Sequence, residues 1–420
     1  MSKIFVSIAA YRDPELLPTL KNLLENCAEP ENLHVCIGWQ HSDEDEWDNL
    51  NEYVRDSRFT ILDINHKDSM GVCWVRSKIQ EFYKEEDYYF QLDSHHRFEK
   101  NWDTILKDYI NLLKCKGFKK PVVSAYVPGY FPETDPENRV QEVWGLNIMR
   151  FLPEGAVFLQ PYHVDRWQDL KEPIPARFVS GHFIFTVGKF VKEVPYDPYF
   201  YFHGEETSLS ARAYTHGYDL FAPHRPIVWH EYTRKGKQRH WDDHKSYNDL
   251  DRASYARFRK LFEMDDVPCT PCQRKALAHY GFGEDRSLQQ YEKYAGLKFK
   301  TRQIHQETLE NKLPPIKGDY ESGLVHKRKI CIDLYKGALV EGPDYDSFAI
   351  AILDEEGKDM YRQDMTAEEM QSLRIQDPDD QFIHIWRDFE SAYEPYSWRI
   401  WPHSISEGWL ERIENKINHQ

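Results

Sequence analysis

The sequence predicts an α/β protein whose first part is built on a mostly parallel β-sheet with crossover helices. Short apolar segments alternate with segments of helical periodicity up to about residue 230, which is the pattern of consecutive strand–helix units. Near the C-terminus, short strand-like segments with alternating apolar residues predominate, which predicts a smaller β-rich domain. We therefore expect an α/β domain over residues 1–262, a helical and loop extension with a linker over 263–325, and a β-rich accessory domain over 326–420.

The predicted strands of the first part are apolar runs that end in polar or turn-forming residues. Residues 4–10 form the first strand, and Pro14 then opens a helix with leucines at helical spacing. Ligands of open α/β sheets bind beyond the carboxyl ends of the strands, so the polar residues that follow each strand are candidates for a binding site. Further strands are expected at residues 33–39, 59–64, 88–93, 121–126, 177–185 and 226–230, and helices at residues 71–83 and 206–215.

The region after residue 260 has a different character. Residues 269–313 are expected to be helical and loop-like, and two prolines and a glycine near residue 315 indicate a linker. Strands of the accessory domain are expected at residues 330–335, 348–353 and 382–386. Cys269 and Cys272 have half of a zinc-ribbon spacing but lack a second pair, so a turn with two free thiols is preferred to structural zinc.

Charge and composition exclude some classes of function. Asp and Glu number 70 against 54 Lys and Arg, a net charge of −16, which disfavours binding to a nucleic-acid backbone. No apolar run reaches the roughly 18 residues of a membrane span, and the N-terminus enters a strand rather than a signal segment. The seven cysteines are odd in number and scattered, which favours reduced thiols and a cytoplasmic location.

The strongest local motif is Asp93-Ser94-His95, directly after the predicted strand at residues 88–93. Residues two apart project the same way, so this carboxylate and this imidazole are expected to face the strand-end crevice together. A divalent cation that bridges phosphates needs one or two carboxylates and open positions, and an imidazole ligand shifts the preference toward manganese. In the alternative interpretation Asp93 caps the next helix and His95 lies on the surface.

Two further motifs carry titratable side chains. Glu205 and Glu206 follow Gly204 at the start of a predicted helix, where a glycine allows a ligand to approach the backbone closely. Carboxylates at a helix N-terminus also complement the helix dipole, which alone would explain one of them. His230 ends the strand at residues 226–230, and a single histidine in such a place is more often structural than a ligand.

Several blocks together carry a resemblance to a known family. Residues 5–16, with the sequence FVSIAAYRDPEL, resemble the opening of the cytosolic hydroxyproline N-acetylglucosaminyltransferases that modify a ubiquitin-ligase adaptor protein. Residues 71–76, 91–98, 102–103 and 203–206 are similar to the other blocks of that family, in the same order, over about residues 3–300. The resemblance implies a GT-A catalytic domain, UDP-N-acetylglucosamine as donor, a protein or glycan hydroxyl as acceptor, and retention at the anomeric carbon.

The resemblance also assigns roles to residues. The Asp-x-His form is similar to that of mucin-type polypeptide N-acetylgalactosaminyltransferases, in which a distant histidine completes the metal site; here this implies His230, in preference to His224, beside Asp93 and His95. Glu205 or Glu206 would bind donor hydroxyls and orient the acceptor. The donor site would comprise Tyr11, Arg12 and Asp13 at uracil and ribose, Gln40 and Asp68 as weaker candidates for the base, Arg76 at phosphate or ribose, and Asp93 and Ser94.

One basic segment stands out in this acidic chain. Residues 234–240 hold four basic side chains around Gly236, and we expect them either to close over the donor phosphates or to form a solvated turn. Three other functions stay open: transfer of a different UDP-sugar to a glycan, sugar binding by an inactive transferase fold, and metal-dependent nucleotidyl transfer or phosphate hydrolysis. The absence of a glycine-rich phosphate loop disfavours the last of these.

Overall fold

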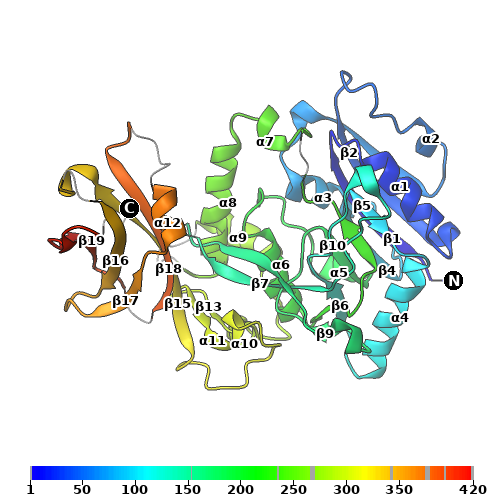
Figure 1. The fold of residues 1–420 in the computed structure, drawn as a ribbon. Helices are drawn as coiled ribbons and strands as arrows, with labels where there is room; N and C mark the ends of the chain where they lie inside the picture. Colours follow the sequence, from blue (N-terminus) through cyan, green and yellow to red (C-terminus); the bar gives the residue numbers. More distant parts are fainter. Residues whose placement is uncertain are drawn as a thin grey trace. The chain divides into compact units, whose positions relative to one another are not determined.

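The computed structural model describes residues 2–152, 154–233, 236–264, 270–340, 344–373, 379–391 and 394–417. The chain forms two compact units, Met1–Gly323 and Leu324–Gln420. The first is a mixed α/β unit and the second is rich in β-strands (Figure 1). The fold class predicted from the sequence is therefore confirmed.

An eight-stranded sheet forms the centre of the first unit, in the order β3-β2-β1-β4-β10-β6-β11-β9. The first four strands of this order are parallel, and β10 runs antiparallel to both of its neighbours. The carboxyl ends of β1 and β4 therefore lie at the same edge, with Ala9 paired to Asp93. The strands are β1 (Ile4–Tyr11), β2 (Leu33–His41), β3 (Phe59–Asn65), β4 (Tyr88–Asp93), β6 (Pro121–Ser124), β9 (Ile174–Pro175), β10 (Phe183–Val187) and β11 (Asp219–Ala222).

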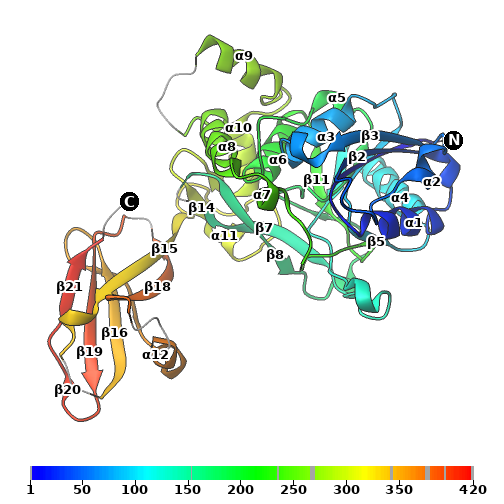
Figure 2. The same cartoon turned by 90° about the horizontal axis from the view of Figure 1, so that it is seen from above.

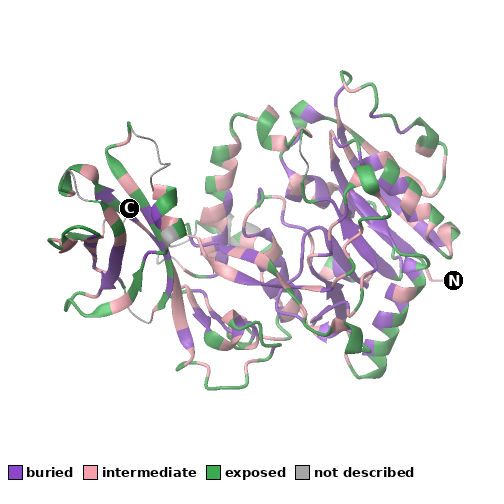
Figure 3. Cartoon of the chain, viewed as in Figure 1, coloured by how far each residue is buried: buried purple, intermediate pink, exposed green. Residues whose placement is uncertain are grey.

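Helices cover both faces of this sheet (Figures 1 and 2). Because side chains alternate along a strand, Phe5 of β1 joins the core against α3 (Val72–Gln80) and α6 (Glu205–Thr215). Val6 and Ile8 join the opposite core, against α1 (Leu16–Glu25) and α4 (Trp102–Cys115). Figure 3 shows the central strands buried and the outer surfaces of the flanking helices exposed. The strands thus read as continuous apolar runs because both of their faces are covered.

Small antiparallel sheets accompany the central one. β5 (His96–Phe98) pairs with β12 (Val228–His230), and β7 (Trp144–Phe151) pairs with β8 (Val157–His163). Neither β5 nor the β7–β8 hairpin was predicted from the sequence. β5 has only three residues, too few for a periodicity signal, and register in β7 shifts between Ile148 and Arg150, which interrupts the alternation that a strand prediction needs.

Some predicted elements are shorter than expected. The strand predicted at residues 177–185 begins only at Phe183, as β10. The residues around Gly181 turn toward α6 instead, where Gly181 N–H donates to Glu206 Oε1 at 2.7 Å. The remaining helices of the first unit are α2 (Asn51–Val54), α5 (Phe190–Glu193), α7 (His240–Asp243), α8 (Tyr247–Leu261), α9 (Pro271–His279), α10 (Leu288–Ala295) and α11 (Gln306–Leu309).

The region predicted as an extension contributes to the core of the first unit. Tyr291 and Ala295 of α10 are fully buried in the same apolar cluster as α3 and α6. Tyr291 OH donates to the backbone carbonyl of Arg177 at 3.0 Å. The short strands β13 (Leu297–Lys298) and β14 (Gln303–His305) form a hairpin beside it. Cys269 and the side chain of Cys272, where a turn with free thiols was expected, lie outside the described residues.

The second unit packs its antiparallel strands around one apolar cluster. β15 (Leu324–Tyr335) pairs with β18 (Phe382–Ser391), and β16 (Tyr345–Leu353) lies between β17 (Asp359–Asp364) and β19 (Ser397–Ser404). The cluster includes Ile332, Ile350 and Ile385. β20 (Gly408–Trp409), β21 (Ile413–Lys416) and α12 (Ala367–Leu373) complete the unit. Within the described residues of the chain, no helix has the length and apolar character needed to cross a bilayer.

Replacement of Trp102 should destabilise the first unit strongly. Trp102 is 0% exposed, packs against Phe90 with tilted rings whose centroids lie 4.9 Å apart, and donates its indole N–H to the carbonyl of Leu23 at 3.0 Å. Trp102→Ala should lower the free energy of unfolding by about 3–5 kcal/mol because it leaves a cavity. Trp47→Ala, at a residue that is 44% exposed, should change it by less than about 0.5 kcal/mol. Denaturant titration measures both, and equal effects would contradict this account.

Candidate active site

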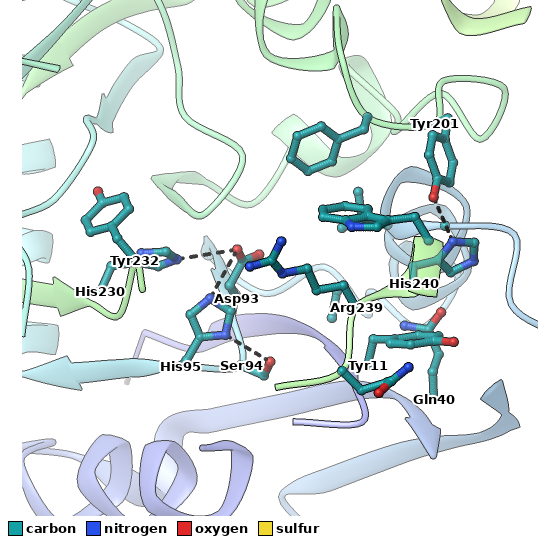
Figure 4. Close-up of a pocket in the computed structure, with 16 residues that line it drawn as sticks. Tyr11, Gln40, Asp93, Ser94, His95, Tyr201, His230, Tyr232, Arg239 and His240 are labelled. Atoms are coloured by element: carbon teal, nitrogen blue, oxygen red, sulfur yellow. Dashed lines mark hydrogen bonds and ion pairs between the residues drawn. The ribbon is translucent and has the colours of Figure 1, made fainter. Parts of the chain in front are cut away.

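A cavity of about 450 Å³ opens at the carboxyl ends of β1 and β4 (Figure 4). This is the edge at which parallel sheets bind ligands. The cavity combines a carboxylate and histidines with several aromatic rings, so it suits a ligand that has both charged and flat or apolar parts. Its lining consists of Ala9, Tyr11, Gln40, Gly71, Val72, Asp93, Ser94, His95, Tyr201, Phe202, His230, Tyr232, Gln238, Arg239, His240 and Trp241.

Three potential metal ligands converge in this cavity. Asp93 ends β4, His95 follows it in the turn to β5, and His230 ends β12. Asp93 Oδ2 lies 3.9 Å from His95 Nε2 and 3.6 Å from His230 Nε2. One ligand atom from each residue lies within 4.8 Å of the other two. Ligand atoms that share an ion at about 2.1 Å are themselves roughly 3–4 Å apart, so the spacing suits a single cation.

The pairing of β5 with β12 explains how His230 reaches the other two residues. The two strands are antiparallel, and His230 lies opposite His96 in their register. The pairing continues one step further, because Glu231 N–H donates to the carbonyl of His95 at 3.1 Å. A histidine at the end of β12 is therefore held beside the Asp93–His95 turn by backbone hydrogen bonds.

Asp13 orients this turn from behind. Its side chain is almost fully buried, and Oδ2 accepts hydrogen bonds from Ser94 Oγ and from His95 Nδ1, both at 2.6 Å. With Nδ1 engaged by a carboxylate, Nε2 of His95 is left to face Asp93. This is the carboxylate–histidine arrangement that commonly supports a metal ligand.

His230 provides a second indication that these residues fit a metal ion. Both of its ring nitrogens are buried and have no hydrogen-bond partner among the residues that the structure describes. Buried polar atoms are normally satisfied, and a bound cation would satisfy one of these. Imidazole ligands suit zinc, whereas carboxylate ligands also suit manganese and magnesium. The residues present thus fit a divalent metal.

Arg76 links the cavity to α6. Its guanidinium is almost fully buried, with Nη2 2.5 Å from Asp93 Oδ1 and Nη1 2.6 Å from Glu205 Oε1. Burial by itself disfavours the charged form of Asp93, but Arg76 and the two histidines outweigh it and hold the pKa of Asp93 well below its usual value. Asp93 is therefore a carboxylate at neutral pH, as a metal ligand must be.

Glu205 and Glu206 lie behind the cavity and do not line it. Glu205 accepts from Arg76 and Tyr196, and Cys73 Sγ lies 3.0 Å from its Oε2. Glu206 accepts from Tyr126 OH at 2.8 Å. Burial, followed by repulsion from Glu205, raises the pKa of Glu206 to about 7.

Of the other residues predicted for the donor site, some line the cavity and others lie outside its lining. Tyr11 and Gln40 line the cavity, and Tyr11 OH donates to Asp243 at 2.7 Å. Arg12 does not line it: the guanidinium pairs with Asp45 at 2.7 Å and with Asp243 at 3.1 Å. Asp68 is exposed on the short 3₁₀ turn after β3 and also lies outside the cavity lining.

His224, the alternative third ligand, is not among the residues that cluster with Asp93 and His95. Its ring packs against Tyr109 of α4, with centroids 5.0 Å apart, and it is absent from the cavity lining. His182 is a residue that the sequence analysis missed. Its ring centroid lies 4.4 Å from that of His230, and its Nδ1 contacts Ser180 Oγ at 2.9 Å. The only signal for it was a polar residue inside an apolar run.

Residues 238–240 of the basic segment border the cavity. Arg239 and His240 line it together with Trp241, and Figure 4 shows the Arg239 guanidinium pointing toward Asp93. Lys237 instead pairs with Glu231. Arg234 and Lys235, which were expected to reach the donor phosphates, lie outside the described residues. The segment was predicted from the sequence, but the aromatic residues that also line the cavity, Tyr201, Phe202, Tyr232 and Trp241, were not predicted as part of the site.

Comparison with known proteins connects this site to a family. The family model described as Glycosyltransferase (GlcNAc) matches residues 3–54 and 47–301. The match spans well over half of the chain and includes Asp93, His95, His230 and both glutamates. The chain belongs to this glycosyltransferase family. It is an enzyme of the sugar-transferring class, and the more specific hydroxyproline-modifying family is not distinguished by this match.

Comparisons with individual proteins are more distant. No curated protein matches this glycosyltransferase in sequence. Among solved structures, GalNAc-T7 with UDP, GalNAc and Mn²⁺ is 13% identical with a TM-score of 0.46, and the alignment covers 70% of this chain. The chain spans 56% of that GalNAc-T7 chain. S. aureus TarS 1-349 with UDP-GlcNAc is 12% identical with a TM-score of 0.38, covering 66% of this chain and 71% of TarS 1-349.

The raised pKa of Glu206 predicts a pH-dependent effect of Glu206→Gln. The unfolded carboxyl ionises near pH 4.5 and the folded one near pH 7, so folding of the wild type is progressively penalised between these values. Relative to wild type, Glu206→Gln should therefore gain stability from pH 4.5 to 7, by on the order of 1–3 kcal/mol. Unfolding by guanidinium at several pH values measures the difference, and a difference that is constant with pH would contradict the assignment.

Proposed function

We propose that this glycosyltransferase moves N-acetylglucosamine from UDP-N-acetylglucosamine to a hydroxyl group of a protein or glycan. We also propose retention at the anomeric carbon and dependence on a divalent metal, Mn²⁺ or Mg²⁺. The observation that carries the proposal is the convergence of Asp93, His95 and His230 in a cavity at the carboxyl edge of the sheet. Membership of the GlcNAc glycosyltransferase family supports the sugar.

The metal and phosphate part of the donor would lie beside these three ligands. A bound divalent ion would supply Lewis-acid neutralisation of the diphosphate leaving group. Arg239 would add a second positive charge, since its guanidinium points into the same part of the cavity. Guanidinium–phosphate hydrogen bonds are strong because both partners are charged. Ser94, which also lines the cavity, would bind the donor beside Asp93.

The nucleoside would occupy the end of the cavity near Tyr11 and Gln40. Gln40 is held there, because its amide donates to the carbonyl of Ala10 at 3.0 Å and its carbonyl accepts from Ser69. Tyr11 is fixed through Asp243, which also holds Arg12. The flat uracil ring matches such aromatic walls. We assign Arg12 and Asp13 the task of positioning Tyr11 and His95, and Asp68 stays an untested candidate.

Glu205 and Glu206 are proposed to act on the chemistry through their neighbours. Glu205 fixes Arg76, which in turn fixes the carboxylate of Asp93. Glu206 holds the phenol of Tyr126, whose ring lies against His182 with centroids 5.1 Å apart. Neither lies in position to form a covalent bond with a sugar in the cavity, since neither lines it. A front-face reaction, in which the leaving phosphate oxygen accepts the proton of the acceptor hydroxyl, is compatible with this arrangement.

The rest of the chain is assigned accessory roles. We propose that residues 1–262 form the catalytic domain and that residues 263–325 stabilise it through packing of the buried α10. We propose that residues 326–420 form an accessory domain. The family match ends at residue 301, so the accessory domain lies outside the part of the chain that matches the family. We place the enzyme in the cytoplasm, as its scattered cysteines favour.

The main alternatives are transfer of a different UDP-sugar to a glycan and sugar binding without catalysis. One experiment separates them: release of UDP from a panel of UDP-sugars, with and without Mn²⁺, by the purified protein. The proposal expects release from UDP-N-acetylglucosamine that requires the metal. Release from another UDP-sugar in preference supports the first alternative, and binding of UDP-sugars with no release from any of them supports the second.

Histidine replacements should distinguish the metal ligands. His230→Ala is expected to reduce transfer at least 100-fold because it removes a ligand, as are Asp93→Ala and His95→Ala. His224→Ala is the matched control, since that ring packs on Tyr109 away from the cavity lining, and it should retain near-wild-type transfer. Steady-state kinetics with saturating Mn²⁺ measures all four. Near-wild-type activity of purified Asp93→Ala would show that the assignment is wrong.

Arg239 should affect donor binding more than folding. Arg239→Ala is expected to raise the KM for the UDP-sugar about tenfold, as expected for a lost charge-assisted hydrogen bond of roughly 1.4 kcal/mol. Donor with metal should also protect the bond after Arg239 from trypsin. Arg252→Ala, on the exposed surface of α8, is the control and should leave the KM unchanged. Equal cleavage with and without donor, together with an unchanged KM in Arg239→Ala, would favour a solvated turn.

A further inference from the structure

A second group of metal-binding residue types lies in the C-terminal unit. Cys331 and Asp333 of β15 and His384 of β18 each place one ligand atom within 4.8 Å of the other two. These residues lie outside the segment matched by the glycosyltransferase family. The group contains a thiol, an imidazole and a carboxylate, in contrast to the cavity group of the first unit, which contains no cysteine.

Strand geometry explains why the three side chains meet. β15 and β18 are antiparallel neighbours, and Asp333 lies directly opposite His384 in their register. Side chains of directly opposed residues on one face have Cβ atoms about 5 Å apart. Cys331 precedes Asp333 by two positions, so the period of two places it on the same face. This is the outer face of the pair, because Ile332 and Ile385 on the other face join the apolar core.

The distances among the three groups are those of a small coordination site. Cys331 Sγ lies 3.3 Å from Asp333 Oδ1 and 4.0 Å from His384 Nδ1. His384 Nδ1 lies 2.7 Å from Asp333 Oδ1. Tetrahedral zinc has bonds of about 2.3 Å to sulfur and 2.0–2.2 Å to nitrogen and oxygen. Such bonds separate the ligand atoms by roughly 3.3–3.6 Å, so shifts of less than about 1 Å would complete the geometry.

Asp380 supplies the supporting carboxylate. Its Oδ2 lies 3.0 Å from Nε2 of His384. A histidine that donates Nε2–H to a carboxylate presents the lone pair of Nδ1 to a metal, which is how supporting residues orient imidazole ligands. Nδ1 is the nitrogen that faces Cys331 and Asp333. The orientation of the ring therefore matches the requirement for a ligand.

We propose that Cys331, Asp333 and His384 bind a Zn²⁺ ion on the outer face of the β15–β18 pair. The thiol and imidazole favour zinc over Mg²⁺ or Ca²⁺, which prefer oxygen ligands. Asp333 and His384 are about half exposed, so water completes the coordination. The ion links two adjacent strands and stabilises their pairing. The thiol proton leaves to solvent on binding, and affinity therefore falls as the pH is lowered. This proposal is independent of the proposed sugar transfer.

Cobalt substitution tests the site in the full-length protein. Co²⁺ bound through a thiolate gives a near-ultraviolet charge-transfer absorption, and the proposed catalytic ligands contain no sulfur. Titration with Co²⁺ should produce this band in the wild type, and addition of Zn²⁺ should remove it. Cys331→Ser should abolish the band. Asp380→Asn should weaken Co²⁺ binding at least tenfold, as expected for the loss of a supporting hydrogen bond.

Two cysteine variants serve as controls. Cys115→Ser, at an exposed thiol of the first unit, and Cys269→Ser should both keep the wild-type band. Circular dichroism of Cys331→Ser should match wild type, since the substitution changes one atom on a partly exposed strand face. Absence of the band in wild-type protein, or its persistence in Cys331→Ser, would overturn the proposal. In that event the three residues form only a hydrogen-bonded ion pair on the sheet surface.

Discussion

The site of the first unit depends on a buried cation, Arg76. Its guanidinium bridges Asp93 at the end of β4 and Glu205 at the start of α6, two elements that are distant in sequence. A buried charge is tolerated only when opposite charges and hydrogen bonds compensate it, and removal of one partner of such a group typically costs 3–5 kcal/mol. The charge balance therefore couples the position of Asp93, a proposed metal ligand, to the packing of α6.

A backbone constraint places His230, the third proposed metal ligand. The β5–β12 pair is only three residues long on each side, yet its register sets His230 beside the turn that holds His95. Asp13, two residues after the end of β1, completes the arrangement through its hydrogen bond with His95. Residues at or just after the carboxyl ends of three strands, β1, β4 and β12, thus meet at one place. Rigid elements hold a site more precisely than loops do, because their side chains are fixed by packing and by hydrogen bonds behind them.

The residue clusters of the two units are brought together in different ways. In the first unit, buried charged residues from several elements contact one another, so the position of each depends on residues that are distant in sequence. In the second, Cys331, Asp333 and His384 meet through the simple register of two adjacent strands. The family match covers the first unit up to residue 301 and leaves the second outside it. The chain therefore combines a region shared with the glycosyltransferase family and a β-rich unit that lies outside the family match.

Sequence alone determined the α/β class, the edge at which the site forms, and the Asp93–His95 pair. These follow from local patterns: apolar runs buried on both faces, and polar residues directly after them. Periodicity could not identify β5, which is too short, or the β7–β8 hairpin, whose register shifts. It could not show that Arg76 faces Glu205, that Asp68 lies outside the cavity, or that His182 and Tyr232 pack beside His230. Only the tertiary structure decided these points, because each depends on which distant elements pack together, and that choice is made by the whole core.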